Sequence, residues 1–430
     1  MNTIEKKDYA RSRLMVIIEA ALEYFIHLCV TGTCLTAILD EMSVSTSLQG
    51  VISAITSLAC SVQLLAVFTV KKTYPCKRWV CMLNLVNQLL FALLYCVPGL
   101  SDKLPRVGIL IVLLSAAYAC QYYLTPSRVN WQMSLVDDNK RGTFTAHKEM
   151  VSLVSGLVVT QAAGILLDHF KAKGDMQTAF VIFGVTVTVL SVLHLITMLF
   201  TDEPKIEQPT HRRGFKEILL VVFGNKNLRR VVIFDVLYVC GTVSLHYYSI
   251  YLVRVFGLPY TYITTVALVH ALFRAAVSHF LGRLADKRSW AYMLRICLIV
   301  FAAGFVVFAI CDASTVKFLY PVFALCQAFA MGGINAGRTN LCLDYAERAD
   351  RRYILGIQSA ISGMCGFFLT LVASAFVERV EQNGNTLFGI PVYAQQVLFG
   401  ASAVMLLVLA FAYLPLFGKP QRMDEAQETV

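Results

Sequence analysis

The chain has 430 residues, of which 57% are hydrophobic and only 15% are charged. Soluble domains carry about 25% charged residues, so this chain has too few charges to cover the surface of a soluble protein of its length. The net charge is +10, and the basic residues lie in short clusters between long apolar runs. This pattern predicts a membrane protein. It excludes a soluble enzyme, a disordered chain, a small disulfide-rich scaffold and a nucleic-acid-binding protein.

Twelve apolar runs reach the length of about 20 residues that a helix needs to cross a bilayer. The first run follows a basic N-terminal segment and is too long for the apolar region of a signal peptide, so we expect an uncleaved span. The predicted spans are 14–38, 47–70, 79–99, 107–128, 148–169, 178–200, 230–252, 262–284, 291–311, 317–338, 354–377 and 393–417.

A polar connector separates the first six spans from the last six. We expect an N-terminal six-helix half at 1–200, a connector at 201–229, a C-terminal half at 230–418 and a tail at 419–430. Within the connector, residues 215–223 favour a short interfacial helix. About 28 Lys and Arg residues fall on the side of the termini and connector, against about 7 on the other side. Both termini and the connector are therefore expected to be cytoplasmic, in the cell membrane.

Several features of the chain recur about 210 residues apart. Arg128 and Asn130 match Arg338 and Asn340, and the basic pair at 140–141 matches the pair at 351–352. These matches predict a six-span unit duplicated in parallel orientation, which is one of the plans used by secondary transporters. The predicted fold is an all-α membrane protein with twelve transmembrane helices in two pseudo-symmetric six-helix halves.

The segment that closes the eighth span resembles a loop motif of the major facilitator superfamily, Gly-x-Leu-Ala-Asp-(Arg/Lys)-x-Gly-(Arg/Lys)-(Arg/Lys). It matches at five positions and departs at Ser289 and Trp290; the matches are Gly282, Leu284, Ala285, Asp286 and Lys287. The loop at 71–79 in the first half keeps only the basic residues, and the antiporter signature of span five is absent. The resemblance implies a cytoplasmic charge relay that includes Arg283 and Asp286.

Polar side chains recur on single faces of spans one, four, seven and ten, the spans that line the central cavity in the superfamily that the chain resembles. Ionisable groups in hydrocarbon are costly, so those present usually face a cavity or a partner. The candidates for substrate binding or ion coupling, with span eight included, are Glu23, His27, Tyr118, Gln121, Tyr122, Asp235, Tyr238, Thr242, His246, His270, Arg274, Gln327 and Asn335.

One intramembrane ion pair is expected, between Asp235 and Arg274. From the helical rise, Arg274 lies about 15 Å and Asp235 about 8 Å from the cytoplasmic end, a gap that a long guanidinium can bridge. The equivalent of Arg274 in the first half is the neutral Gln63, which favours a role confined to the second half. A purely structural pair with Asp235 remains the alternative for Arg274.

Other polar residues have simpler expected roles. Glu19 is balanced between a role in the membrane and an ordinary contact at the interface, and His194, His279 and Arg295 are expected to be boundary or packing residues. A cytoplasmic gate is favoured over substrate contact for the repeated arginines. The gate and loop-motif candidates are Arg128, Asn130, Arg141, Gly282, Arg283, Asp286, Arg338, Asn340 and Arg352.

The sequence thus predicts a secondary transporter that moves a small organic solute by alternating access. Glu23, with His27, is a candidate proton site or substrate contact, and Asp235 is a second coupling candidate; uniport without protons stays open. The expected partners are the solute, protons as coupling ion and membrane lipid, for a monomer without enzymatic activity, cofactor, metal site or nucleic acid. The alternative is a membrane sensor or scaffold on a transporter-like fold, which would add a soluble domain or a long tail.

Overall fold

The fold is almost entirely α-helical, as the long apolar runs require of a chain that must satisfy its backbone hydrogen bonds in lipid. The computed structural model describes residues 9–69, 76–101, 103–136, 141–204, 215–346 and 350–417. Its contacts divide the chain into two units. Unit 1 comprises residues 1–42 and 68–212, and unit 2 comprises residues 43–67 and 213–430.

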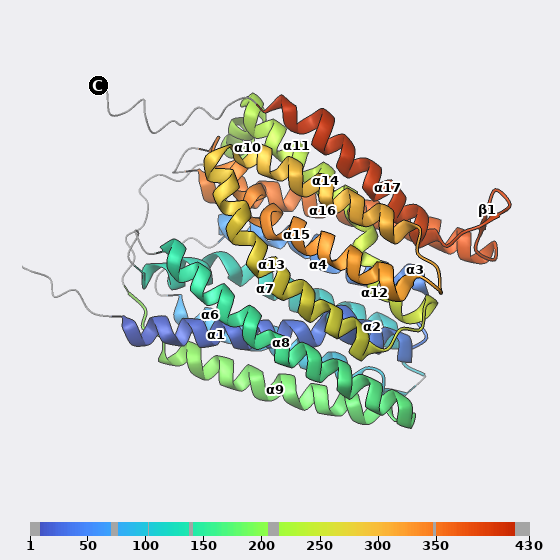
Figure 1. Cartoon of the computed structure of the whole chain (residues 1–430). Helices are drawn as coiled ribbons and strands as arrows, with labels where there is room; N and C mark the ends of the chain where they lie inside the picture. Colours follow the sequence, from blue (N-terminus) through green and yellow to red (C-terminus); the bar gives the residue numbers. More distant parts are fainter. Residues whose placement is uncertain are drawn as a thin grey trace, which may run out of the picture. The chain divides into compact units, whose positions relative to one another are not determined.

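Unit 1 is a bundle of long helices in which α1 packs against α8 and α9, and α6 packs against α7 and α9 (Figure 1). The close approach of α8 to α1 depends on Gly156, because a Cβ there would overlap the ring of Tyr24. The helices are α1 (Ala10–Val30), α2 (Gly32–Glu41), α6 (Lys77–Leu93), α7 (Arg106–Ser134), α8 (Arg141–Lys173) and α9 (Met176–Phe200).

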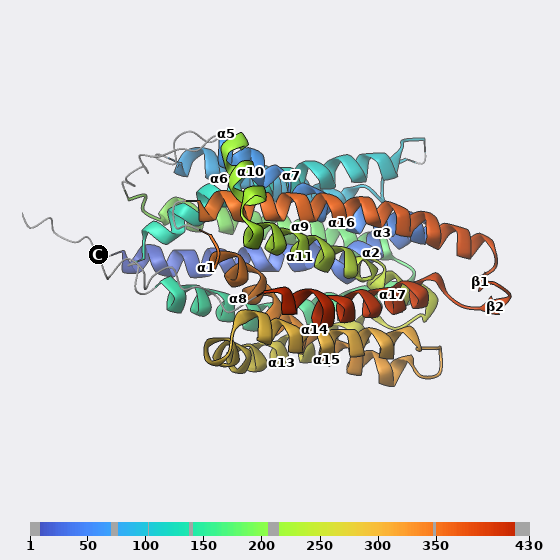
Figure 2. The same cartoon turned by 90° about the horizontal axis from the view of Figure 1, so that it is seen from above.

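Unit 2 is a second helical bundle, in which α15 packs against α13 and α14, α17 packs against α14, and α16 packs against α11 (Figure 2). A short hairpin of β1 (Thr386–Leu387) and β2 (Ile390–Pro391) follows α16. The helices are α3 (Thr46–Ser53), α4 (Ile55–Ala59), α5 (Val62–Thr69), α10 (Phe215–Gly224), α11 (Lys226–Gly241), α12 (Tyr248–Ile250), α13 (Tyr260–Lys287), α14 (Trp290–Ala309), α15 (Val316–Leu343), α16 (Arg351–Gln382) and α17 (Ala394–Val408).

The second predicted span, which forms α3, α4 and α5, packs with helices from the second half of the sequence. A Cβ on Gly363 of α16 would overlap the backbone oxygen of Ser57, so the two backbones are nearly in contact. Ser374 of α16 donates a hydrogen bond to the backbone oxygen of Ser47 at 3.0 Å. These contacts group residues 43–67 with unit 2, although the chain enters and leaves this segment from unit 1.

The predicted spans agree closely with the helices, and eleven stretches of the described chain are long and apolar enough to cross a membrane. The seventh span is the exception, because α11 gives way to a 3-10 turn at Val243–His246, the short α12 and a π-helical turn at Tyr251–Val255. The expected helix at 215–223 is α10. The twelve-helix fold in two halves is confirmed.

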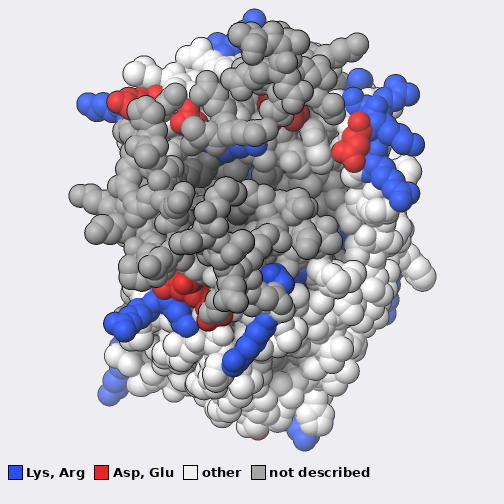
Figure 3. All heavy atoms as spheres, turned by 90° about the vertical axis from the view of Figure 1, so that its left-hand side faces the viewer, with Lys and Arg blue, Asp and Glu red and all other residues white. Residues whose placement is uncertain are grey.

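The helices extend further at one end than the apolar runs predicted. The fourth span was expected to end at 128 and the tenth at 338, whereas α7 continues to Ser134 and α15 to Leu343. Two arginines expected at span ends, Arg128 and Arg338, therefore lie inside helices. Figure 3 looks onto the side from which α1 starts, and Lys and Arg side chains are visible there in several separate groups.

Candidate functional site

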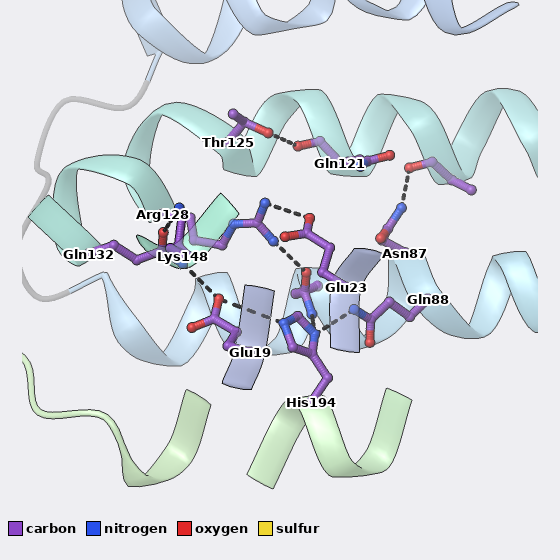
Figure 4. Close-up of polar contacts among 12 residues, drawn as sticks. Glu19, Glu23, Asn87, Gln88, Gln121, Thr125, Arg128, Gln132, Lys148 and His194 are labelled. Atoms are coloured by element: carbon purple, nitrogen blue, oxygen red, sulfur yellow. Dashed lines mark hydrogen bonds and ion pairs between the residues drawn. The ribbon is translucent and has the colours of Figure 1, made fainter. Parts of the chain in front are cut away.

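Unit 1 holds a buried ion pair between two helices that each present polar residues one turn apart. Glu19 and Glu23 of α1, and Arg128 and Gln132 of α7, have the i, i+4 spacing that places side chains on one helix face. The Nη2 atom of Arg128 lies 2.6 Å from Oε1 of Glu23 (Figure 4). The Arg128 side chain is 9% exposed and that of Glu23 is 25% exposed, so the cation is the more deeply buried partner.

His194 of α9 joins this pair to α6 through two amide side chains. The ring is fully buried, and its Nδ1 atom lies 2.9 Å from Nδ2 of Asn84 and 2.5 Å from Nε2 of Gln88. With both amides donating to Nδ1, the neutral ring carries its hydrogen on Nε2, the atom that faces Oε1 of Glu19 at 3.7 Å. Asn84 also accepts a hydrogen bond from Nη1 of Arg128 at 3.4 Å.

The second carboxylate of the cluster, Glu19, is held by an amide and lies near a lysine. Nε2 of Gln132 donates to Oε1 of Glu19 at 2.9 Å, and Nζ of Lys148 on α8 donates to Oε1 of Gln132 at 3.3 Å. Figure 4 shows these side chains converging from α1, α6, α7, α8 and α9. We call this set the unit 1 network: Glu19, Glu23, Asn84, Gln88, Arg128, Gln132, Lys148 and His194. Its two carboxylates and two basic groups balance when the histidine is neutral.

Two residues of the unit 1 network were underestimated from the sequence. Glu19 is 1% exposed and takes part in the network, so it is not a residue at the interface. His194 was expected to be a packing residue and instead lies at the centre of the network. The signal that could have found it is the pair Asn84 and Gln88, two amides one turn apart inside a span without charged residues.

The other candidates of unit 1 are not among the residues of the unit 1 network. His27 is exposed, and its backbone oxygen accepts a hydrogen bond from Thr31, while Glu23 pairs with Arg128. Tyr118 is buried with its ring edge against Phe91, at 5.2 Å between centroids, which is a packing role. The other positions divide as follows: the amide oxygen of Gln121 is buried without a hydrogen-bond partner, Tyr122 is half-buried, Asn130 is exposed, and the side chain of Arg141 lies outside the described part.

Unit 2 has its own acid–arginine pair, between α11 and α15. Nε of Arg338 donates to Oδ1 of Asp235 at 2.5 Å. The guanidinium also lies over the ring of Tyr238, 4.5 Å from its centroid, and the Tyr238 hydroxyl lies 3.8 Å from the sulfur of Met331. The expected Asp235–Arg274 pair is therefore wrong. Because α15 continues past Arg338, this arginine faces Asp235 from inside the helix bundle and takes the place assigned to Arg274.

Three other sequence candidates line one cavity of about 340 Å³ within unit 2. His270 and Arg274 come from α13 and Gln327 comes from α15. The remaining wall is formed by Tyr248, Ala267, Tyr320, Ala324 and Met331. The hydroxyls of Tyr248 and Tyr320 form a hydrogen bond of 2.7 Å, and Nε2 of His270 is buried without a hydrogen-bond partner.

The last candidates of unit 2 do not join this cavity. Thr242 hydrogen-bonds to the backbone oxygen of Tyr238, His246 is half-buried in the 3-10 turn and Asn335 is exposed. Asn340 donates to the backbone of its own helix.

The loop-motif and gate candidates at the ends of the helices form no cluster in the described residues. Arg283 and Asp286 are exposed at the end of α13, and no ion pair joins them in the part of the chain that is described. Gly282 has open space around it. The side chain of Arg352 lies outside the described residues. The charge relay implied by the motif stays a prediction.

Two repeated helical bundles with buried acid–arginine pairs between their first and fourth spans define a membrane transport protein of the two-half type. The sequence model of the Major Facilitator Superfamily matches residues 20–370 and 247–429. The chain therefore belongs to the major facilitator superfamily. No curated protein matches the chain in sequence.

Solved structures with similar folds are themselves transporters. A nucleoside transporter, NupG, in a mutant form, aligns with a TM-score of 0.73 and 13% identity over 95% of this chain and 100% of that one. A D-xylose-proton symporter aligns with a TM-score of 0.66 and 13% identity over 94% and 98% of the two chains. A bacterial homolog of the human lysosomal transporter Spinster aligns with a TM-score of 0.60 and 16% identity over 96% and 97%. At these identities the likeness extends to the fold alone.

Proposed function

We propose that this transporter moves a small organic solute by alternating access and couples the movement to protons through the unit 1 network. The observation that carries the proposal is one cluster of two carboxylates, a histidine and two basic groups, joined by an ion pair and by amide side chains. Such a cluster can exchange a proton for an ion-pair contact, because protonating Glu23 would release Arg128. The fold neighbours include a D-xylose-proton symporter, which supports this direction.

Within the network, Glu23 is proposed as the carboxylate that binds the coupling proton. Glu19 is proposed as the second carboxylate that balances the basic side chains. Glu23 is 25% exposed and holds the ion pair, whereas Glu19 is 1% exposed and bonded to Gln132. A proton can reach the more exposed carboxylate from water, and neutral Glu23 would leave Arg128 to the remaining carboxylate. Asp235 is proposed as a structural acid, because it is buried against Arg338.

The test begins with the substrate. Purified protein is screened by thermal shift against metabolites, with nucleosides and D-xylose among them, and the hits are assayed for uptake in proteoliposomes. A proton gradient is expected to drive uptake by the native protein. Glu23→Gln is expected to abolish this gradient dependence while keeping exchange of labelled for unlabelled solute.

Asp235→Asn is the matched control, because it removes the equivalent carboxylate of unit 2. It is expected to keep the response to the proton gradient even where it lowers the amount of folded protein. Unchanged gradient dependence in Glu23→Gln would remove Glu23 from the coupling role. Uptake of no solute under any gradient would favour the sensor or scaffold on a transporter-like fold.

For the topology we propose a monomer in the cell membrane with both termini and the connector in the cytoplasm, and halves at 1–200 and 230–418. The basic side chains at the end of the molecule from which α1 starts support this orientation (Figure 3). Single-cysteine labelling from outside the cell, at Lys173 and at Lys226, tests it. Only position 173 is expected to react with a membrane-impermeant reagent.

A further inference from the structure

We propose that the cavity between α12, α13 and α15 binds a small organic monoanion, a carboxylate on a flat apolar body, with Arg274 as its counter-ion. This inference rests on the proposed transport function and names the class of solute. The cavity belongs wholly to unit 2 and measures about 340 Å³, within the usual range for sites of small molecules.

The cavity lining carries a positive charge. Arg274 lines the cavity, and no carboxylate in the described part of the chain forms an ion pair with it. Asp235, the acid expected from the sequence to pair with Arg274, holds Arg338 at 2.5 Å instead. A guanidinium inside a membrane protein carries a full positive charge at any accessible pH and requires a partner or water. The cavity therefore has one positive charge that the bound solute can neutralise.

Uncharged polar groups line the cavity together with Arg274. His270 lies one helical turn from Arg274 on the same face of α13, and its Nε2 atom is buried without a hydrogen-bond partner. Gln327 adds an amide from α15. A carboxylate accepts two parallel hydrogen bonds from the guanidinium fork, and a neighbouring imidazole N–H can donate a third. The three side chains thus give the cavity lining its charged and amide-type polar groups.

The rest of the cavity wall determines which apolar group of the solute fits. The rings of Tyr248 and Tyr320 lie 5.9 Å apart between centroids, and their hydroxyls are bonded to each other. The other groups are Ala267, Ala324 and Met331, which are apolar. Aromatic walls favour flat apolar groups. A phosphate monoester carries a charge of about −1.5 to −2 at neutral pH, which one arginine does not balance, so a carboxylate fits better.

The test compares each acid with its uncharged amide, which has nearly the same shape. Benzoate, 4-hydroxybenzoate and phenylacetate are titrated against benzamide, 4-hydroxybenzamide and phenylacetamide, with uridine and D-xylose as neutral polar probes. Binding to the full-length protein in nanodiscs is measured by calorimetry. At least one acid is expected to bind about tenfold more tightly than its amide, the order of one charge-assisted contact.

Variants assign that preference to Arg274. Arg274→Gln is expected to erase the difference between acid and amide, and Arg274→Lys to keep part of it, because lysine retains the charge without the fork. Arg295→Gln is the matched control, since Arg295 of α14 lies over the ring of Phe411 and does not line the cavity. It is expected to leave binding unchanged. Each variant's melting temperature verifies that it is folded.

The outcomes separate this inference from the proposed function. Acids that bind no better than amides, or a preference that survives Arg274→Gln, would overturn the inference. Transport of a neutral solute that is insensitive to Arg274→Gln would do the same and leave the transport function standing. Arg274-dependent binding of an acid that is never taken up would support the ligand class and refute transport.

Discussion

The acid–arginine pairs of the two units occupy equivalent places in the repeat, and their burial is reversed. Glu23 and Asp235 are about 210 residues apart, as are Arg128 and Arg338. In unit 1 the arginine is 9% exposed and the acid 25%. In unit 2 the arginine is 26% exposed and the acid 1%. The same pair thus buries its cation in one unit and its anion in the other.

The side chains around the two pairs differ accordingly. The buried Arg128 also donates to the amide oxygen of Asn84, inside a network of amides and a histidine. The buried Asp235 has Arg338, whose guanidinium rests on the Tyr238 ring. Removing one partner of a buried pair costs most when the partner left behind is the one with no access to water. Loss of the acid should therefore cost more stability than loss of the arginine in unit 1, and less in unit 2.

The largest effect is expected from Arg338→Gln, which leaves Asp235 charged and buried. The free energy of unfolding should fall by about 3 kcal/mol, the lower end of the range for breaking a buried pair. Asp235→Asn should cost less, because the partly exposed Arg338 can reach water. Thermal unfolding of both variants in the same detergent measures the order. An equal or larger loss for Asp235→Asn would contradict this interpretation of burial in unit 2.

In unit 1 the order should invert. Glu23→Gln leaves the buried Arg128 without its closest counter-charge and should destabilise the protein by about 2 kcal/mol, since the hydrogen bond to Asn84 remains. Arg128→Gln leaves a carboxylate that is 25% exposed and should cost less. The measurement is the same unfolding experiment. Parallel orders in the two units would show that burial does not govern the effect.

The unit 1 network can be tested by replacing two of its residues with those found at the equivalent positions of unit 2. The counterparts of Glu19 and Gln132, each one helical turn from a pair member, are the buried Val231 and Cys342. Glu19→Val alone removes the acceptor of the buried Gln132 amide nitrogen and should cost about 2 kcal/mol. The double change Glu19→Val with Gln132→Cys should cost less than the single one. A double-mutant cycle with additive losses would mean that the two side chains do not interact.

The smallest effect is expected at Tyr238, the ring beneath Arg338. Tyr238→Leu removes the aromatic face and should cost about 1 kcal/mol, the scale of a partly desolvated cation–π contact. Tyr238→Phe keeps the ring and should change the melting temperature very little. A loss for phenylalanine as large as that for leucine would assign the role to the hydroxyl, which both variants lack.

The spans and the repeat could be predicted from the sequence, because length and apolar content alone determine which runs cross a bilayer. The ion pairing could not. Arg128 and Arg338 were placed at span ends, since charged residues close an apolar window even where the helix continues. Helix continuation to Ser134 and Leu343 depends on packing between helices, which a window of hydropathy does not record.

The candidate site divides in the same way. His270, Arg274 and Gln327 were found from their polarity inside apolar runs, and they share a cavity. His194 and Glu19 have the same polarity, yet their importance comes from side chains on other helices that meet them. A single sequence shows which residues are unusual in a membrane and leaves open which of them meet.

The grouping of α3 and α4 with α16 has a consequence for how the chain can be divided. Cutting the connector would not release two self-contained pieces. The N-terminal piece would carry the segment 43–67, which contacts Gly363 and Ser374 of α16. Neither fragment would then be complete. The piece ending near 204 would expose a helical surface shaped for α16, and its recovery should depend on co-expression of the other piece.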